Sequence, residues 1–486
     1  MRRMLCPSVV GRDDELASLS AGLDDLQDGR GGCLLLAGEP GIGKSRLARE
    51  AAAAAQRRGV TVLFGRASPT GASVPYQCLT SALLHGLRSS SVDASNLQPL
   101  RAGLATLLPG FIEGPTVEPS PVLLGETVLR LAALLGGEDG ALMVLEDVHW
   151  ACGESLAVTE YLADNAASER VLLLGTSRPE GEALAVINAL DRRGSASVSR
   201  LAPLDPEHVS EMATACLADS GSVPAGVLDV LHARAGGLPF LVEELLAGLI
   251  TRGSLVAQQA GWQLRDKRRV DVPMSFAQSI SDRLAGLSTR DRRVIDLAAI
   301  LGRDFDWSHL HRIVGATEAD VLDSLSRAVE LQLVDETGAG RFQFRHALTV
   351  DAILDGMLGP YRVRLAAGAL DKLTAGPEPV APELLPLAAH LALQAGRPVE
   401  ASHYLTEDAR VALGAGAIAT AVAAARRARD TLPLGHADTI AASEVLLSAL
   451  IQAGDSGAAD AVGRALIAEL DVHRAPADRR AAVRLL

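Results

Sequence analysis

The stretch GCLLLAGEPGIGKSRLARE, residues 32–50, decides the fold of the first part of this chain. Residues 34–37 form a short apolar run typical of a buried strand, and a helical pattern runs from residue 45 into the alanines at 51–55. The residues between them, 38–45, fit the pattern GxxxxGK followed by Ser or Thr. A strand, a glycine-rich loop and a helix in this order predict a phosphate-binding loop.

Each part of this loop has a mechanical reason. Glycines let the backbone turn its N–H groups inward around phosphates, and the helix N-terminus adds the positive end of its dipole. Lys44 supplies a compact charge for the β and γ phosphates, and the Ser45 hydroxyl can ligate Mg²⁺. The alternative is a glycine-rich turn that contains a lysine by chance. The residues expected to bind nucleotide are Gly38, Glu39, Pro40, Gly41, Ile42, Gly43, Lys44, Ser45 and Arg46.

A second apolar run ends in two carboxylates in LMVLEDVHWAC, residues 142–152. In P-loop NTPases an acid at the end of a second buried strand holds magnesium, and a nearby residue orients or activates water. Glu146 is therefore the magnesium candidate and Asp147 the candidate base, although the two roles could be exchanged. The plainer alternative is a strand that simply meets water.

A third run, VLLLGTSRPE at 171–180, closes with an arginine. Arg178 could sense the γ-phosphate, or it could be a solvated side chain in a turn. Buried strands separated by helical segments, with polar groups at their carboxyl ends, predict a doubly wound parallel sheet with the ligand at the strand tips. The expected fold is an α/β P-loop NTPase that binds ATP or ADP with Mg²⁺, with Ser45, Glu146 and Asp147 as metal ligands.

Length and composition limit the other possibilities. A chain of 486 residues should hold several domains. Its net charge of −13 argues against the chain as a whole gripping DNA. Five cysteines without a CxxC spacing indicate neither a disulfide framework nor a zinc site. The sequence shows no apolar stretch long enough for a membrane span and no signal-peptide pattern, so we expect a cytoplasmic protein without a membrane partner.

Further motifs stand in order along nearly the whole chain: VVGRDDEL at 9–16, GGLPFLVEEL at 236–245 and FRHALTVDAIL at 344–354. Together with the P-loop, the acidic pair and GTSRPE, they resemble the large ATP-binding regulators of the LuxR family. Those regulators belong to the signal-transduction ATPases with numerous domains, in which ATP versus ADP sets a switch. The order of these motifs along the chain is more specific than any single motif.

The resemblance implies roles for five more residues. Val10, Gly11 and Arg12 would lie by the adenine or its ribose, although Arg12 could simply precede an amphipathic helix. Pro239 resembles the proline of a helical lid over the base, or it is a helix breaker. His346 resembles the family's winged-helix histidine, or it is an ordinary core or surface residue.

Two departures from the family pattern concern hydrolysis. Cys152 stands where the family usually has an acid after Trp-Ala, and Ala366 stands where a histidine is usual near the end of the winged helix. The first departure weakens any role for a third acid near the water or the metal. We therefore expect a weak ATPase at most.

The domain boundaries follow from composition and patterning. Residues 1–200 would form the P-loop ATPase domain, and 201–268 a helical lid that continues as helices with short loops to about residue 265. Residues 269–375, with a hairpin in LVDETGAGRFQFRH, would form a winged-helix domain. After a proline-rich linker, 376–486 would form tetratricopeptide-like helical repeats, which present a face to peptides or ligands.

The function expected is a signalling switch, in which nucleotide state controls the binding of an unknown small-molecule or protein inducer, or of a protein partner on the repeats. The competing classes are an ATP-driven remodelling enzyme and a non-catalytic scaffold that retains ATP for stability. The family's helix-turn-helix is not recognisable in residues 437–486, so DNA would be a partner only if a reader is supplied elsewhere. The chain would then be either a shortened form or part of a longer protein.

Overall fold

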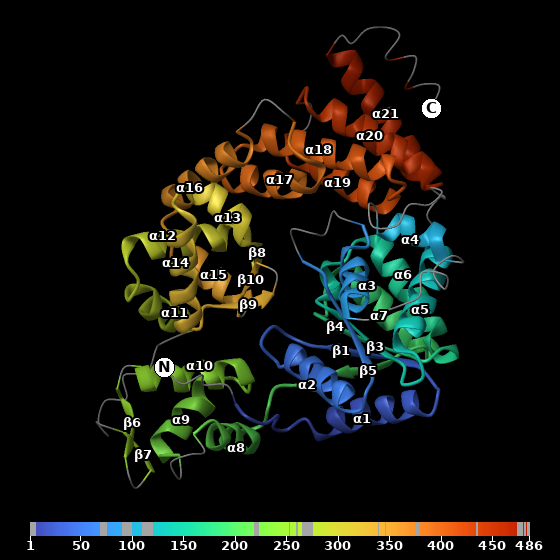
Figure 1. The fold of residues 1–486 in the computed structure, drawn as a ribbon. Coiled ribbons are helices and arrows are strands. Elements are labelled where there is room, and N and C mark those ends of the chain that lie inside the picture. The colour runs from blue at the N-terminus through green and yellow to red at the C-terminus, as the bar shows by residue number, and fades with distance from the viewer. Residues whose placement is uncertain are drawn as a thin grey trace.

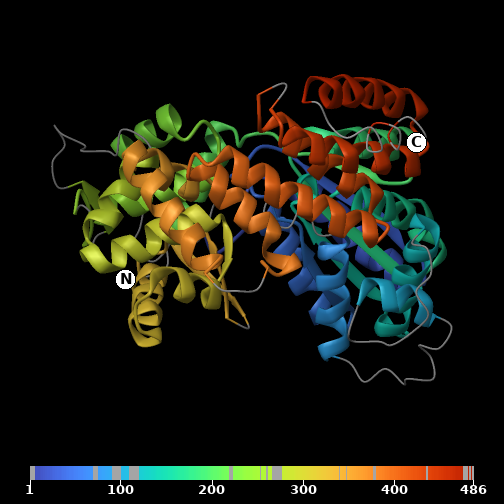
Figure 2. The same cartoon turned by 90° about the horizontal axis from the view of Figure 1, so that it is seen from above.

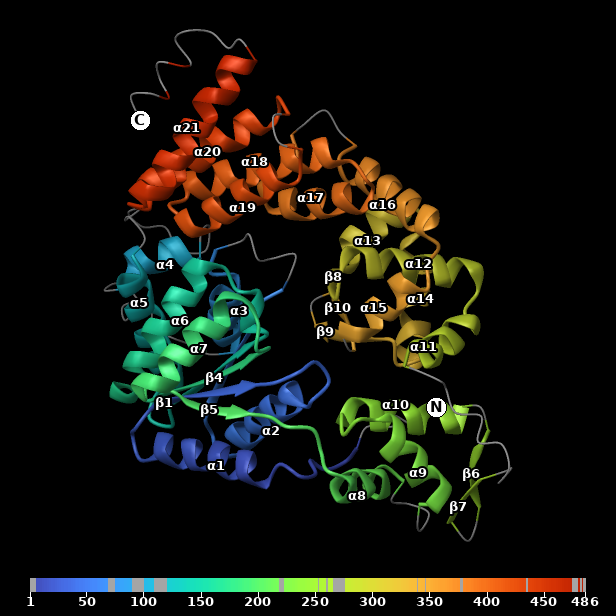
Figure 3. The ribbon, with the colours of Figure 1, turned by 180° about the vertical axis from the view of Figure 1, so that it is seen from behind.

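The structure is a computed structural model, in which an N-terminal α/β domain is followed by three largely helical regions (Figures 1 and 3). No helix in the described part of the chain is both long and apolar enough to cross a bilayer. All five cysteines are free thiols in the structure. The structure describes residues 6–68, 75–89, 100–108, 120–217, 223–251, 253–258, 261–264, 276–338, 340–345, 347–375, 379–433, 436–473, 480 and 483.

A parallel sheet of five strands organises the first domain, in the spatial order β2-β3-β4-β1-β5. At the carboxyl ends of the strands, Arg66 lies opposite Glu146, and Ala37 lies opposite Ser177. This sheet confirms the expected P-loop NTPase fold. The strands are β1 (Gly32–Ala37), β2 (Thr61–Arg66), β3 (Ala141–Glu146), β4 (Val171–Ser177) and β5 (Ser197–Arg200).

Helices cover both faces of the sheet because its central strands are apolar on both sides. In β3, Leu142 and Val144 pack with α1 (Asp13–Gln27) and α2 (Lys44–Arg57). The alternate residues Met143 and Leu145 belong to the cluster on the opposite face. Such continuous apolar strands are typical of a parallel sheet between two helical layers. The opposite layer comprises α3 (Gln77–Ser89), α4 (Arg101–Leu107), α5 (Pro121–Gly136), α6 (Gly153–Asn165) and α7 (Gly181–Arg193).

The region after β5 is helical only in part. Helices α8 (Pro206–Cys216), α9 (Ala225–Arg234) and α10 (Pro239–Thr251) pack around a shared apolar cluster. Residues beyond them form an antiparallel hairpin of β6 (Leu255–Gln258) and β7 (Gly261–Leu264). The expectation of helices to residue 265 is therefore wrong here. Leu255 and Trp262 of the hairpin instead join the apolar cluster of the lid.

The next region combines helices with a three-stranded antiparallel sheet, β8-β10-β9, as expected of a winged helix. The expected hairpin in 333–346 forms between β9 (Val334–Gly338) and β10 (Arg341–Phe344), and β8 (Asp304–Asp306) adds to it. Phe305, Phe342 and Phe344 pack against one another at its centre. The helices are α11 (Phe276–Ala285), α12 (Thr289–Leu301), α13 (Trp307–Val314), α14 (Glu318–Glu330), α15 (Ala347–Asp355) and α16 (Gly359–Leu373).

The last region is a row of helices in which each packs on the next through small side chains. Seen from above, the row runs from the winged helix back to the ATPase domain (Figure 2). Its helix α19 contacts α6, which closes the four regions into a ring. The helices are α17 (Leu385–Gln394), α18 (Pro398–Gly414), α19 (Ile418–Asp430), α20 (Thr439–Gln452) and α21 (Ser456–Val472).

Truncation of a core leucine in the sheet should lower stability. Leu174 of β4 is fully buried in the cluster that joins the sheet to α1 and α2. We expect Leu174→Ala to lower the free energy of unfolding by about 2–5 kcal/mol, because it removes apolar contacts and leaves a cavity. Leu134→Ala is the control, since Leu134 of α5 is 41% exposed. Chemical denaturation of the full chain measures both, and equal midpoints for the two variants would contradict this packing.

Candidate nucleotide site

The loop between β1 and α2 has the backbone of a phosphate cradle. Gly41 and Gly43 have φ angles of 81° and 109°, in the left-handed region that favours glycine. Gly43 directly precedes α2, so the N-terminus of that helix opens into the loop. The Lys44 ammonium donates to the carbonyl oxygens of Gly38 at 2.7 Å and Glu39 at 2.9 Å. The expected P-loop residues are thus brought together as a loop that holds its own lysine.

Lys44 lies in a buried and electropositive environment. Burial lowers the pKa of its ammonium to about 8, and the nearby charge of Asp147 opposes that shift. The charges of Arg178 and Arg303 lower the Lys44 pKa further. An anion bound in the loop would relieve both the desolvation and the repulsion between these cations.

The acidic pair at the end of β3 is almost completely enclosed. Glu146 is 1% exposed and forms an ion pair with Arg66 at the end of β2. Its second oxygen, Oε1, is buried and has no hydrogen-bond partner among the described residues. Asp147 takes a left-handed conformation (φ 56°), and its N–H donates to Thr176 Oγ1 at 3.0 Å. This bond ties the end of β3 to the end of β4.

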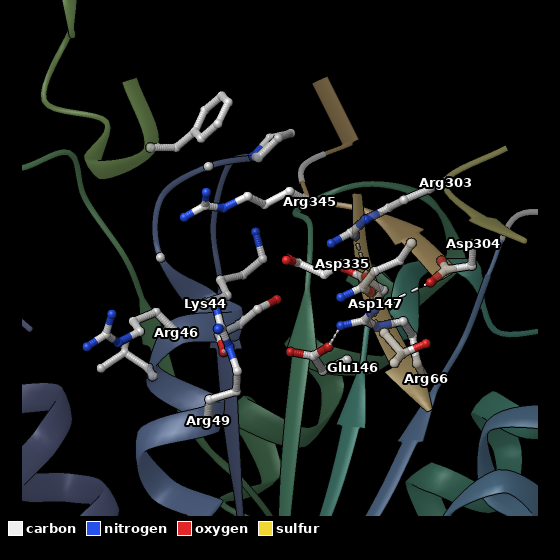
Figure 4. A pocket seen from close by; sticks show the side chains of 18 of the residues that line it. Lys44, Arg46, Arg49, Arg66, Glu146, Asp147, Arg303, Asp304, Asp335 and Arg345 are labelled. Carbon is white, nitrogen blue, oxygen red and sulfur yellow. Dashed lines mark hydrogen bonds and ion pairs between the residues drawn. The ribbon is translucent and has the colours of Figure 1, made fainter. Parts of the chain in front are cut away.

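The carboxylate of Asp147 is paired with an arginine of the winged helix. Arg303, the residue just before β8, donates from Nη1 to Asp147 Oδ2 at 2.8 Å. Arg66 lies 3.8 Å from the same oxygen and also pairs with Asp304 at 3.5 Å. Figure 4 shows Arg303 and Asp304 above Asp147, with Lys44 facing them across the pocket. No sequence motif pointed to Arg303, whereas Arg66 is recognisable as a polar residue that ends a strand.

The sensor candidate Arg178 lies beside a histidine that sequence reasoning passed over. Its backbone N–H donates to His149 Nδ1 at 3.3 Å, and its guanidinium lies over the ring of Trp150. Burial lowers the pKa of His149 to about 4, although Asp147 opposes this, so His149 is neutral at physiological pH. Arg178 also pairs with Glu180 at 3.5 Å. It lines the same cavity as Lys44 and Asp147.

The N-terminal segment and the lid form the other wall. Val10 and Pro239 line the cavity, and the Phe240 N–H donates to the carbonyl of Gly41 in the P-loop at 3.3 Å. Arg12 is buried, and its Nη2 donates to Ala202 O at 2.7 Å and Ile42 O at 3.3 Å. Its guanidinium thus binds backbone carbonyls that link the P-loop to the segment after β5.

The remaining candidates are Gly11, Arg46 and His346, and Arg46 is the one among the described residues that lines the cavity. Gly11 has a φ of 64°, and a Cβ there would meet the His208 ring at 2.7 Å. Arg46 donates to Cys6 O and Glu50, which fastens the N-terminal segment to α2. His346 lies outside the described residues, whereas its neighbour Arg345 lines the cavity.

These elements enclose a cavity of about 1100 Å³ with an excess of basic lining. Ten basic side chains, counted without histidine, face five acidic ones among its described lining residues. This balance favours a polyanionic ligand over a neutral one. The basic residues are Arg12, Lys44, Arg46, Arg49, Arg66, Arg88, Arg178, Arg303, Arg341 and Arg345, and the acidic ones are Glu146, Asp147, Glu243, Asp304 and Asp335.

Comparison with known proteins identifies the first domain. Residues 8–174 match the family model of the AAA ATPase domain. The match includes the P-loop and both carboxylates at the end of β3, and it ends before Arg178. This part of the chain is therefore an ATP-binding domain of the AAA type, and such domains generally bind ATP or ADP with Mg²⁺.

Longer similarities are weaker. An uncharacterised protein of Rhizobium meliloti (strain 1021) is 25% identical over 391 residues, or 73% of this chain and 36% of that protein. The chain thus spans about a third of the length of that relative. A Signal Transduction ATPase with Numerous Domains (STAND) protein with a tetratricopeptide repeat sensor from Pyrococcus horikoshii is 14% identical, with a TM-score of 0.47 over 98% of this chain and 67% of that chain. Cdc6p from Pyrobaculum aerophilum is 15% identical, with a TM-score of 0.36 over 74% of this chain and 98% of that chain.

The Lys44 environment predicts proton uptake on nucleotide binding at alkaline pH. Below a pKa of about 8 the ammonium is already formed, whereas above it the empty site holds mostly neutral amine. Triphosphate favours the charged form, so binding should take up close to one proton at pH 9.5 and almost none at pH 7. Calorimetric titration in buffers of different ionisation enthalpy measures this uptake. Heats that do not depend on the buffer at pH 9.5 would refute the assignment to Lys44.

Proposed function

We propose that the chain is a nucleotide-dependent signalling switch that binds ATP with Mg²⁺ and hydrolyses it slowly, like the LuxR-family regulators that its motifs resemble. One observation carries the proposal. A single cavity is lined by the P-loop, by the lid at Pro239 and by the winged helix at Arg303. A nucleotide bound there would contact three regions at once, so its phosphate number could bias their arrangement.

The oxygen-bearing side chains around the loop fit a magnesium ion. Ser45, Glu146 and Asp147 line the cavity, and Glu146 carries a buried oxygen without a partner in the described part of the chain. Mg²⁺ prefers such hard oxygen ligands and usually shares them with phosphates. When bound, the ion would neutralise charge that develops on the β and γ phosphates. The lid residues and the segment at Val10 would hold the adenine and its ribose.

Slow hydrolysis follows from how the carboxylates are engaged. Asp147, the proposed base, is paired with Arg303, and Glu146 is paired with Arg66. Cys152 takes the position where the related regulators usually have an acid, and its Sγ contacts Ser155 Oγ. Water activation therefore depends on Asp147 exchanging its partner.

Two substitutions separate nucleotide binding from chemistry. Lys44→Ala should purify without bound nucleotide, because the cradle loses its phosphate cation. Asp147→Asn should keep nucleotide while turnover falls by roughly 10²-fold or more, because the base is lost. Chromatography of the released nucleotide and a phosphate-release assay give the two readouts.

Arg57→Ala, at the exposed end of the same helix as Lys44, is the control and should behave as wild type. Equal nucleotide retention by the Lys44 variant would rule out the phosphate assignment. Turnover well above about 1 per second in the wild type would favour an ATP-driven remodelling enzyme over a switch.

A contact between α19 and α6 would couple the repeats to the ATPase domain. Glu154, at the start of α6, accepts from the Thr420 backbone N–H at 2.7 Å and from Thr420 Oγ1 at 2.6 Å. The contact is tight, since a Cβ on Gly153 would lie 2.8 Å from the Ala419 Cβ. An inducer or protein partner on the repeats could shift α19 and so α6. Helix α6 begins shortly after Asp147 in the sequence.

Loss of this contact should open the ring. Hydrogen bonds to a charged group contribute about 1.5–3 kcal/mol each, so Glu154→Ala should lower the ratio of closed to open molecules at least about tenfold. Small-angle scattering should then show a larger radius of gyration. Glu160→Ala is matched, because Glu160 lies on the same helix but pairs with Arg193 inside the ATPase domain. Identical scattering by wild type and the Glu154 variant would argue against a latch at α19.

A further inference from the structure

Among the arginines that the winged helix places in the ATPase cavity, Arg303 has little freedom of its backbone. Arg303 stands between α12 and β8, and its carbonyl accepts from the Phe344 N–H of β10 at 2.8 Å. Phe344 is fully buried in the core of the winged helix. The position of Arg303 therefore follows the position of the whole winged-helix domain.

Only some of the N–H groups of the Arg303 side chain make hydrogen bonds in this arrangement. Its Nη1 donates to Asp147, but its Nε is buried and makes no hydrogen bond within the described ranges. A buried guanidinium N–H without an acceptor is costly, because it has lost water and gained no partner. A phosphate oxygen in the cavity would supply the missing acceptor.

The Asp147 carboxylate would still have a cation nearby if Arg303 moved away. Arg66 Nε lies 3.8 Å from the same Asp147 oxygen and is itself buried without a hydrogen-bond partner in the described structure. Removing one partner from a buried pair is normally expensive, since the other charge remains uncompensated. Here a second cation is already in place, so the exchange of Arg303 from carboxylate to phosphate costs less.

Charge in the cavity favours that exchange once a triphosphate is bound. Lys44, Arg178 and Arg303 line the same space, and the charges of both arginines lower the pKa of Lys44. A γ-phosphate between them would attract all three cations. A guanidinium presents two parallel N–H donors in a planar fork that matches two phosphate oxygens, and an ammonium has no such fork.

We propose that Arg303 is an arginine finger supplied in cis by the winged helix, which leaves Asp147 for the γ-phosphate when ATP binds. This inference rests on the proposed ATP-binding function and adds a catalytic residue to it. The freed Asp147 carboxylate accepts a proton from water as the water oxygen bonds to the γ-phosphorus. The bond from that phosphorus to the β–γ bridging oxygen breaks, which leaves ADP and phosphate. Arg303 then returns to Asp147, so the winged helix registers the loss of the γ-phosphate.

The opposite role for the same contact is an inhibitory lock, in which Arg303 only keeps Asp147 from water. The two roles predict opposite effects on the hydrolysis rate when Arg303 is removed. A finger that is removed slows hydrolysis, and arginine fingers contribute roughly 10³–10⁵-fold to the rate. A lock that is removed leaves hydrolysis unchanged or speeds it.

The test compares wild type, Arg303→Ala and Arg303→Lys in the full-length chain with Mg²⁺. Single-turnover hydrolysis of radiolabelled ATP gives the rate, and calorimetry gives the affinities for ATP and ADP. For Arg303→Ala we expect a rate at least about 10³-fold lower, an unchanged affinity for ADP and a weaker affinity for ATP. Arg303→Lys, which keeps the charge but loses the planar fork, should fall between the two.

Arg312→Ala is the control, because it removes an exposed arginine from the same domain. Hydrolysis by Arg303→Ala at the wild-type rate or faster, with ADP still bound, would overturn the finger assignment. If the alanine variant misfolds, the lysine variant decides, since a lock or a structural ion pair predicts no loss of rate there. Failure of the wild type to bind ATP would instead refute the proposed function itself.

Discussion

Positive charge gathered in one partly closed cavity is the condition on which the rest of this structure depends. The chain carries a net charge of −13, yet the lining of this cavity holds twice as many basic as acidic side chains. Burial is the main cause of the lowered pKa of Lys44, and the charges of Arg178 and Arg303 lower that pKa further. A bound polyanion would relieve this repulsion, and a nucleoside triphosphate is such a polyanion.

The fold brings this charge together from distant parts of the chain. Parallel strands bring the P-loop, the carboxylates and Arg178 to one edge of the sheet, as their carboxyl ends must meet there. The lid adds Pro239 and Phe240 against the P-loop, and the winged helix adds Arg303 from the opposite side (Figure 4). The repeats close the ring at α6. Each region therefore has a contact through which a change at the phosphates could reach it.

The sequence predicted the parts of this site that local spacing determines. The P-loop is one continuous motif, and the acidic pair directly follows an apolar run that is typical of a buried strand. The parallel arrangement of the sheet also followed from the apolar runs, whereas the order of its strands was not predicted. Arg66 was within reach of this reasoning, because it ends β2 opposite Glu146, but its neighbours in the sequence carry no nucleotide motif.

The features that the sequence missed depend on contacts between distant segments. Arg303 meets Asp147 across 156 residues, and Glu154 meets Thr420 across 266. Neither pair leaves a periodic pattern, because each depends on how whole domains pack. The β6–β7 hairpin was missed for a local reason, since its strands are only four residues long and alternate weakly. Short strands of this kind are stabilised by the lid cluster that they join rather than by their own pattern.

Direct titration is the simplest test of whether this cavity binds ATP with its metal. Nucleotide-free full-length chain should bind ATP in the presence of Mg²⁺ with one-to-one stoichiometry and a clear heat. ADP should compete with ATP for the same site. A folded chain that shows no heat and no competition with either nucleotide would contradict the binding of ATP in this cavity.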